Sequence, residues 1–285
     1  MMKSTHELFR PATLSAPIIV ASPHSGRDYD WPFATAPALD AARIRSSEDA
    51  YMDRLLADVP SLGVPLLVAR VPRALLDLNR AAEELDPAVI QGVPRGVTNP
   101  RISSGLGVIP RVVAQGRAIY AGKISRAEAR ARIDQVWHPY HDTLRGVMDE
   151  AQAVFGRAVL LDLHSMPHEA IENAGPAGRT PQVVLGDRFG ASAAGHMVDA
   201  LERILGDLGL RVARNAPFAG AYVAQAYGRP TQGRHAIQIE IDRALYLDES
   251  RVRPNARFDE MRELLTEAVA RFCDVVGGAE ALAAE

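Results

Sequence analysis

The chain has 285 residues, of which 47% are hydrophobic and 24% are charged, a mixture typical of a globular domain with a sizeable core. Its formal net charge is -3 and its pI is near 6.3. This balance does not favour nucleic acid or an anionic membrane as a partner, since proteins that bind either are usually basic.

The sequence also lacks the usual features of secreted and membrane proteins. A single cysteine, Cys273, excludes an internal disulfide, which fits a reducing compartment. Residues 1–15 contain no continuous apolar stretch of a secretory signal. No run approaches the roughly 20 apolar residues that span a bilayer. We therefore expect a cytoplasmic protein with no membrane partner.

Apolar runs and periodicity predict alternating strands and helices. The predicted strands cover 17–22, 64–71, 74–80, 158–164, 181–187 and 235–241. The predicted helices cover 46–60, 125–155, 190–207 and 256–276, the second with a kink at Pro139. Between them, the Pro-, Gly- and Asn-rich residues 81–122 predict a long loop. The alternation predicts a layered α/β fold with a mixed, mostly parallel sheet, and no shift in composition divides 1–285 into domains.

Polar residues collect at the ends of the predicted strands. His24 follows the first strand, Asn79 and Arg80 end the third, and His164 ends the fourth, while Glu240 lies inside the last. In open α/β sheets, ligands bind at the carboxyl ends of the strands. These residues are therefore candidates for one functional site.

Two histidines and a carboxylate form the three-ligand set of a catalytic zinc site, whose fourth position takes water. His24 and His164 are the candidate imidazoles. The carboxylate is expected from the segment 48–53, where Glu48, Asp49 and Asp53 stay open as alternatives. Asp49 and Asp53 are four residues apart and would share one face of the predicted helix.

The remaining polar residues suggest roles around such a metal. Glu240 could accept a proton from the attacking water and return it to a leaving nitrogen. Asp162 could orient a ligand histidine, and the planar guanidinium of Arg80 could bind a substrate carboxylate. Each has a structural alternative: hydrogen-bonded strand-end histidines, solvated acidic residues at a helix start, or an Asn-Arg turn cap with a surface ion pair.

Other hydrolase motifs are absent from the sequence. It has no Gly-x-Ser-x-Gly nucleophile elbow and no Walker A loop. His138 and His141 could form a second metal pair, but a structural role beside Pro139 is favoured.

Over about residues 17–249, the sequence resembles the N-formylglutamate amidohydrolase family of zinc hydrolases. The order and spacing of the matching stretches carry the resemblance. They are PHSG (23–26), EDAYMDRL (48–55), PRALLDLNR (72–80), WHPYHDTLR (137–145), LLDLHSMP (160–167), NAPFAGAYV (215–223), YGRPTQGRHAIQIEI (227–241) and YLDE (246–249).

The resemblance implies a fold and a set of roles. The family is similar to zinc carboxypeptidases and aspartoacylases, which implies a three-layer fold with a mixed central sheet between helices. It implies one Zn2+ per chain held by His24, Asp49 and His164, with Glu48 or Asp53 as the alternatives to Asp49. It also implies Asn79 and Arg80 as the clamp for a substrate carboxylate, Glu240 as the base, and Arg73 as a group that polarises the scissile carbonyl.

The implied reaction is hydrolysis of a linear amide in a small acidic N-acyl amino acid, with N-formylglutamate as the type substrate. Members that act in histidine degradation tend to carry Arg-His before Tyr-Gly, where this sequence has Gln225-Ala226. A related deacylase or carboxypeptidase-like hydrolase is therefore the nearest alternative, and a non-catalytic protein that binds an acidic metabolite is a more distant one. The sequence does not indicate an oligomeric state.

Overall fold

The structure is a computed structural model, and it describes residues 4–31, 35, 37–94, 96, 100–172, 174 and 180–278. The chain divides into two compact units. The first comprises Met1–Glu7, Pro23–Ala50 and Val68–Thr143, and the second comprises Leu8–Ser22, Tyr51–Leu67 and Leu144–Glu285. A single domain over 1–285 stays a prediction.

A seven-stranded sheet has the order β1-β3-β2-β6-β9-β7-β8. Its strands are β1 His6–Phe9, β2 Ile18–Ser22, β3 Leu66–Ala69, β6 Ala158–Met166, β7 Val183–Gly186, β8 Val212–Arg214 and β9 Arg234–Asp242. Strand β6 is parallel to both β2 and β9, β7 is parallel to β8, and β7 is antiparallel to β9. The sheet is therefore mixed and mostly parallel, as predicted.

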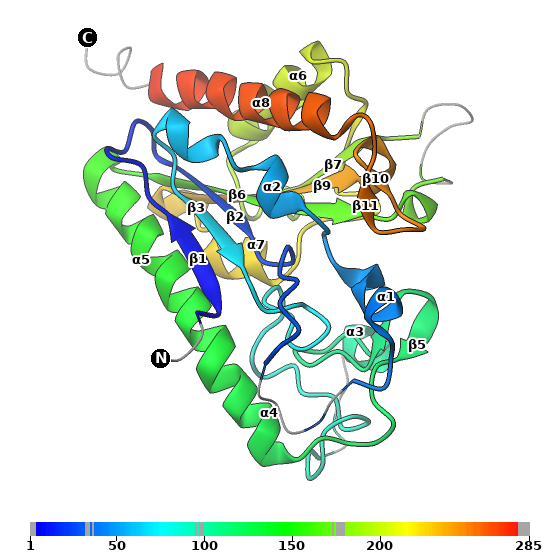
Figure 1. The fold of residues 1–285 in the computed structure, drawn as a ribbon. Coiled ribbons are helices and arrows are strands. Elements are labelled where there is room, and N and C mark those ends of the chain that lie inside the picture. Colours follow the sequence, from blue (N-terminus) through cyan, green and yellow to red (C-terminus); the bar gives the residue numbers. More distant parts are fainter. Residues whose placement is uncertain are drawn as a thin grey trace. The chain divides into compact units, whose positions relative to one another are not determined.

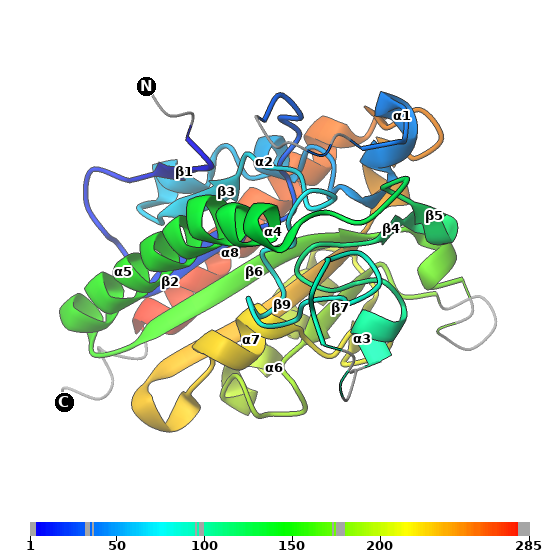
Figure 2. The same ribbon diagram turned by 90° about the horizontal axis from the view of Figure 1, so that it is seen from below.

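Helices of the second unit cover the sheet on both faces (Figures 1 and 2). Helices α6 (Gly195–Asp207) and α8 (Phe258–Gly278) lie on one face. Helix α7 (Tyr222–Tyr227) and the C-terminal part of α5 (His138–Phe155) lie on the other. Coverage on both faces explains why every residue of β2, β6 and β7 is buried. This confirms the predicted α/β class.

The apolar side of α8 shows why this segment is helical. Buried residues recur every three or four positions, the spacing of one helix face: Met261, Leu265, Ala268, Val269, Phe272 and Val276. The predicted helix over 256–276 is confirmed. No helix among the described residues has both the length and the apolar character needed to cross a membrane.

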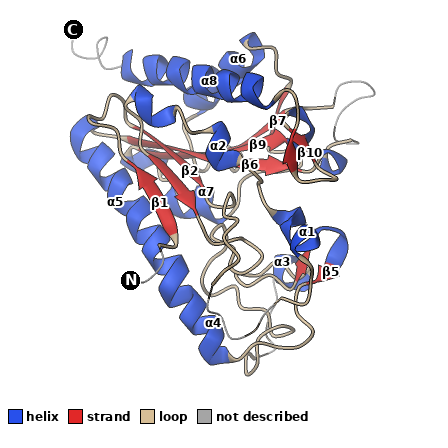
Figure 3. Ribbon diagram, in the orientation of Figure 1, coloured by secondary structure: helices blue, strands red, loops and turns tan. Residues whose placement is uncertain are grey.

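The first unit is built mainly from irregular segments and short elements (Figure 3). These are α1 Ala41–Ile44, α3 Pro100–Ser103, α4 Arg126–Arg132 and the hairpin of β4 Val112–Val113 with β5 Arg117–Ala118. Among its described residues, the predicted loop over 81–122 thus contains α3, this hairpin with a 3-10 turn at Ala114–Gly116, and an isolated bridge at Ile90. Residues 95 and 97–99 lie outside the described residues. A second hairpin, β10 Leu247–Asp248 with β11 Arg253–Pro254, belongs to the second unit.

The predicted helix over 46–60 is wrong. The segment forms a 3-10 turn at Arg45–Ser47, the single-turn helix α2 at Met52–Leu55 and another 3-10 turn at Val59–Leu62. Tyr51 breaks any longer helix because its φ of 63° lies in the left-handed region. Asp49 and Asp53 therefore do not share a helix face.

The predicted strand over 74–80 is also wrong. This apolar segment is buried but folds as turns, in which the N–H groups of Leu75 and Leu76 donate to the carbonyl of Pro72. The N–H of Asp77 donates to Val108 rather than to a neighbouring strand. A continuous apolar run indicates burial, but its lack of alternation cannot distinguish a strand from a buried loop.

The predicted helix over 125–155 is confirmed with one irregularity. Ser125 caps α4 by accepting a hydrogen bond from the N–H of Glu128. A π-helical turn, Ile133–Trp137, then joins α4 to α5. This turn precedes Pro139, where the sequence predicted a kink. Proline has no N–H to donate into the preceding turn, so the irregularity costs no hydrogen bond at that position.

The other predicted elements are confirmed with shifted ends. Strands form within 17–22, 64–71, 158–166, 183–186 and 234–242, while the helix expected over 190–207 begins only at Gly195. The short elements β1, β8 and α7 were not predicted from the sequence.

Candidate active site

Both candidate histidines lie at or just beyond one pair of neighbouring strands in the second unit. In the parallel pair β2–β6, Ala21 is opposite Asp162. His24 follows Ala21 by three residues and His164 follows Asp162 by two. Chain continuity from this one pair of strands therefore directs both histidines to the carboxyl edge of the sheet.

His24 is buried and contacts two carboxylates. Its Nε2 lies 2.7 Å from Oδ1 of Asp77, and its Nδ1 lies 3.4 Å from Oδ2 of Asp49. The backbone N–H of Asp49 also donates to the carbonyl of His24 at 3.0 Å. If Asp77 accepts the Nε2 proton, the lone pair of the ring is on Nδ1, toward Asp49.

His164 has the same arrangement. Its Nε2 lies 2.9 Å from Oδ2 of Asp162, which is fully buried. The pairing assigns the ring proton to Nε2 and the lone pair to Nδ1. Asp162 thus lies where the sequence analysis placed it, beside a candidate ligand histidine.

One ligand atom from each of His24, Asp49 and His164 lies within 4.8 Å of the others, and all three residues are buried. Two neutral imidazoles and a carboxylate suit zinc, and both histidines have a carboxylate on the other ring nitrogen, as metal-bound histidines usually do. The donor set therefore fits a divalent metal ion.

Neither alternative to Asp49 has this arrangement. Glu48 is buried but accepts hydrogen bonds from the Tyr29 hydroxyl at 2.7 Å and from Nε of Arg45 at 3.1 Å. Burial raises the pKa of the Glu48 carboxyl, although both of these donors oppose the shift. Asp53 lies on the separate helix α2. Among the described residues, the group that could hold a metal includes Asp49 and neither of these.

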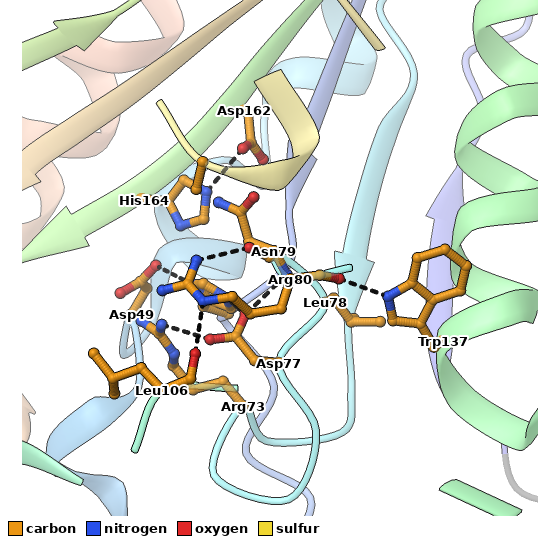
Figure 4. A network of polar contacts seen from close by, with 12 residues as sticks. Asp49, Arg73, Asp77, Leu78, Asn79, Arg80, Leu106, Trp137, Asp162 and His164 are labelled. Atoms are coloured by element: carbon orange, nitrogen blue, oxygen red, sulfur yellow. Dashed lines mark hydrogen bonds and ion pairs between the residues drawn. The ribbon is translucent and has the colours of Figure 1, made fainter. Parts of the chain in front are cut away.

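Asp77 connects several residues of the first unit (Figure 4). Its Oδ2 accepts from Nη2 of Arg73 at 2.8 Å, and its Oδ1 accepts from the backbone N–H of Asn79 at 2.8 Å. Burial opposes ionisation of Asp77, but the charges of Arg73 and Arg80 and the hydrogen bond from His24 prevail and hold its pKa well below the usual range. The carboxylate is therefore charged near neutral pH.

Asp77 was not among the site residues predicted from the sequence. Its one available signal was an acidic residue inside the apolar run ALLDL, and charged residues are seldom fully buried unless they are paired. A strand was expected there, and alternate residues of a strand lie on opposite faces. An acidic residue in such a strand can face solvent, so Asp77 did not indicate a buried, paired carboxylate.

Arg80 is buried beside this network. Its Nε donates to the carbonyl of Leu106 at 2.9 Å, and its Nη1 donates to the carbonyl of Asn79 at 2.8 Å (Figure 4). Burial lowers the pKa of Arg80, an effect that Asp77 opposes; a guanidinium nevertheless keeps its charge in proteins. Its remaining N–H groups suit a carboxylate.

Glu240 lies beside His164 in the register of β6 and β9. Its Oε1 accepts from Nε2 of Gln238 at 2.8 Å, and Gln238 Oε1 in turn accepts from the N–H of Ala221 at 2.9 Å. The polar, alternating side of β9 is thus buried and hydrogen-bonded, and Glu240 lies next to a candidate metal ligand.

Comparison with known proteins identifies similar sequences. The family model for N-formylglutamate amidohydrolase matches residues 16–247. N-formylglutamate deformylases of Pseudomonas aeruginosa and Pseudomonas putida are 30% and 27% identical over 241 residues, which cover 82% of this chain and 83% of each relative.

Solved structures include similar chains. The N-formylglutamate amidohydrolase of Ralstonia eutropha JMP134 has a TM-score of 0.89 and 34% identity, covering 96% of this chain and 99% of that one. A gene product of Agrobacterium tumefaciens, with a TM-score of 0.64 and 17% identity over 94% of this chain and 96% of that one, shares the fold. The chain therefore belongs to the N-formylglutamate amidohydrolase family, whose members are amidohydrolases that cleave an amide C–N bond.

Proposed function

We propose that this protein hydrolyses N-formyl-L-glutamate to formate and glutamate, with one zinc ion per chain held by His24, Asp49 and His164. The observation that carries the proposal is the buried His-Asp-His group whose ligand atoms lie within 4.8 Å of one another. The names of the relatives support the substrate.

When bound, zinc would supply a Lewis acid that polarises the formyl carbonyl and lowers the pKa of water. Glu240 accepts the proton of the attacking water and delivers it to the departing amine nitrogen. Gln238 supports this role, because its amide hydrogen bond fixes one oxygen of the carboxylate. Water thus adds to the formyl carbon, the C–N bond breaks, and formate and glutamate are released.

The arginines of the first unit act on the substrate's charges. Arg73 donates to the oxyanion that develops on the formyl oxygen, and its ion pair with Asp77 fixes the guanidinium. Arg80 and Asn79 bind a substrate carboxylate and thereby orient the amide for attack. A cytoplasmic location and a small acidic N-acyl amino acid as the partner stay predictions.

A related N-acyl amino acid deacylase is the second candidate. The observation in its favour is Gln225-Ala226 on α7, in place of the Arg-His pair that the resemblance associates with histidine degradation. Loss of a cationic pair would weaken binding of a second carboxylate, so this enzyme could accept other acyl amino acids.

Metal content and formate release test both candidates. We expect about one zinc per chain, and formate release from N-formylglutamate that a chelator abolishes and added zinc restores. Zinc without formate release, but with hydrolysis of another N-acyl amino acid, would favour the second candidate. Failure to bind zinc after reconstitution would contradict the mechanism.

A further inference from the structure

The segment 74–80 carries Asp77, Asn79 and Arg80, yet it is not held by strand pairing. Three of its carbonyls instead accept hydrogen bonds from side chains of one helical segment. Arg132 Nη1 donates to Leu75 at 3.1 Å, His141 Nε2 to Leu78 at 3.0 Å, and Trp137 Nε1 to Arg80 at 2.9 Å. All six residues belong to the first unit.

The π-helical turn explains why one helix can reach all three carbonyls. In a regular α-helix, residues five apart such as Arg132 and Trp137 differ by about 140° around the axis. The π turn closes a hydrogen bond from the N–H of His138 to the carbonyl of Ile133, five residues earlier. This wider turn brings Arg132 and Trp137 closer to one face, and His141 follows Trp137 by four residues, about one regular turn.

The three donors are themselves fixed. Arg132 is fully buried, donates to the Tyr120 hydroxyl at 2.6 Å and pairs with Glu128. The rings of Trp137 and His141 are in contact, with centroids 4.0 Å apart and an interplanar angle of 37°. A rigid donor loses little entropy on holding its acceptor, so these contacts can restrict the backbone of 74–80.

We infer that Trp137 and His141 are positioning residues for substrate binding: across the π turn they hold the backbone of Leu78 and Arg80, and thereby the guanidinium that binds the substrate carboxylate. The inference rests on the proposed function of Arg80. It assigns a role to the WHPYH motif (137–141). In this motif His141 binds the backbone carbonyl of Leu78. Figure 4 shows Trp137 directed at this segment from the neighbouring helix.

Trp137→Phe tests the inference, because it removes the Nε1–H donor and keeps an aromatic ring against His141. In the zinc-loaded enzyme, we expect KM for N-formylglutamate to rise about fivefold, the effect of one lost hydrogen bond, with little change in kcat. Arg80→Lys should raise KM more strongly. The double variant should be no worse than Arg80→Lys alone, because both changes affect one contact.

A substrate-free measurement separates this inference from the proposed function. Deuterium uptake by residues 74–80 should be faster in Trp137→Phe than in the unchanged protein. The control is Thr143→Ala, which removes a hydrogen bond from the same helix to His6 at 2.9 Å and leaves 74–80 untouched. It should change neither KM nor uptake in 74–80.

The outcomes are distinct. Unchanged uptake in 74–80, or effects of Trp137→Phe and Arg80→Lys on KM that add, would overturn the positioning role. If the unchanged, zinc-loaded protein releases no formate, the proposed substrate is wrong, while the exchange experiment still decides whether Trp137 holds the segment. His141→Gln, which keeps a donor near Leu78, should retain more of the protection of 74–80 against deuterium uptake than His141→Ala.

Discussion

Asp77 and His24 form a buried pair in which Oδ1 of the carboxylate lies 2.7 Å from Nε2 of the imidazole. The same carboxylate binds Arg73 and the backbone of Asn79. One side chain thus sets the tautomer of a candidate metal ligand and also anchors residues proposed to bind the substrate.

Replacing Asp77 should therefore weaken the metal site. In Asp77→Asn the amide cannot supply the charge that favours the Nε2 proton, so we expect zinc affinity to fall about 10- to 100-fold, measured by competition with a chelator. Asp134→Asn, at a half-exposed site on the π-helical turn, is the control and should bind zinc normally. If Asp77→Asn binds zinc as tightly as the unchanged protein, Asp77 does not orient His24.

Glu240→Gln should separate metal binding from catalysis. The amide cannot accept a proton, so we expect kcat to fall by roughly 100- to 10,000-fold while zinc content is unchanged. The same substitution at Glu202, which pairs with Arg214 outside the site, should leave formate release intact. Activity retained in Glu240→Gln would remove Glu240 from the role of base.

Gly26 should tolerate no side chain. A Cβ at this position would lie 2.2 Å from the backbone carbonyl oxygen of Val71, closer than any real contact. Gly26→Ala must therefore displace the turn after His24, and we expect about 1–3 kcal/mol lower unfolding free energy together with weaker zinc binding. Gly146→Ala, where a Cβ meets nothing within 4 Å, should retain both properties.

The contribution of His168 to stability should depend on pH. A hydrogen bond to Asp242 at 2.9 Å is the main cause that raises the pKa of His168 above 6.5, the ordinary value. A raised pKa in the folded state means that protonated His168 stabilises the fold. That stabilisation is complete below the unfolded-state pKa and disappears as pH rises through the folded-state pKa.

His168→Gln should therefore lower the unfolding free energy more at about pH 5 than at about pH 8.5. We expect a difference below about 1 kcal/mol, because the side chain is 45% exposed and solvent screens the pair. Denaturant titrations at both pH values measure it. If the loss of unfolding free energy in His168→Gln does not vary with pH, the His168–Asp242 pair is not its cause. The same holds if the loss in His168→Gln varies with pH equally in an Asp242→Asn background.

The strands that carry the site could be predicted because their apolar runs are continuous and both faces of the sheet are covered. The predicted strands 158–164 and 235–241 lie within two residues of the observed limits of β6 and β9. His24 follows the end of such a run, as predicted, whereas His164 lies two residues before the observed end of β6 at Met166 rather than at the end itself. Short elements such as α7 and β8 have too few residues for a periodic pattern.

The rest depended on tertiary contacts that the sequence does not display. The left-handed conformation of Tyr51 separates Asp49 from Asp53, and only the folded backbone reveals it. His24, the partner that connects Asp77 to the candidate metal site, is 53 residues away in the sequence. The segment around Asp77 resembled a strand because it is buried, but its carbonyls are bound by a helix.

Glu240 lies in an interior strand, with His164 opposite it on β6 and Val184 opposite it on β7. Backbone ladders on both sides leave this residue little freedom to move. The connecting loops that would surround an acyl group have no such restraint. The proposed proton-transfer group is thus held by the sheet, and Gln238 links it to the connecting segment at Ala221. Changes of length or composition in the other loops would therefore redirect the enzyme toward other acyl amino acids without rebuilding its base. For enzyme engineering, this makes the loops, rather than the sheet, the natural place to diversify.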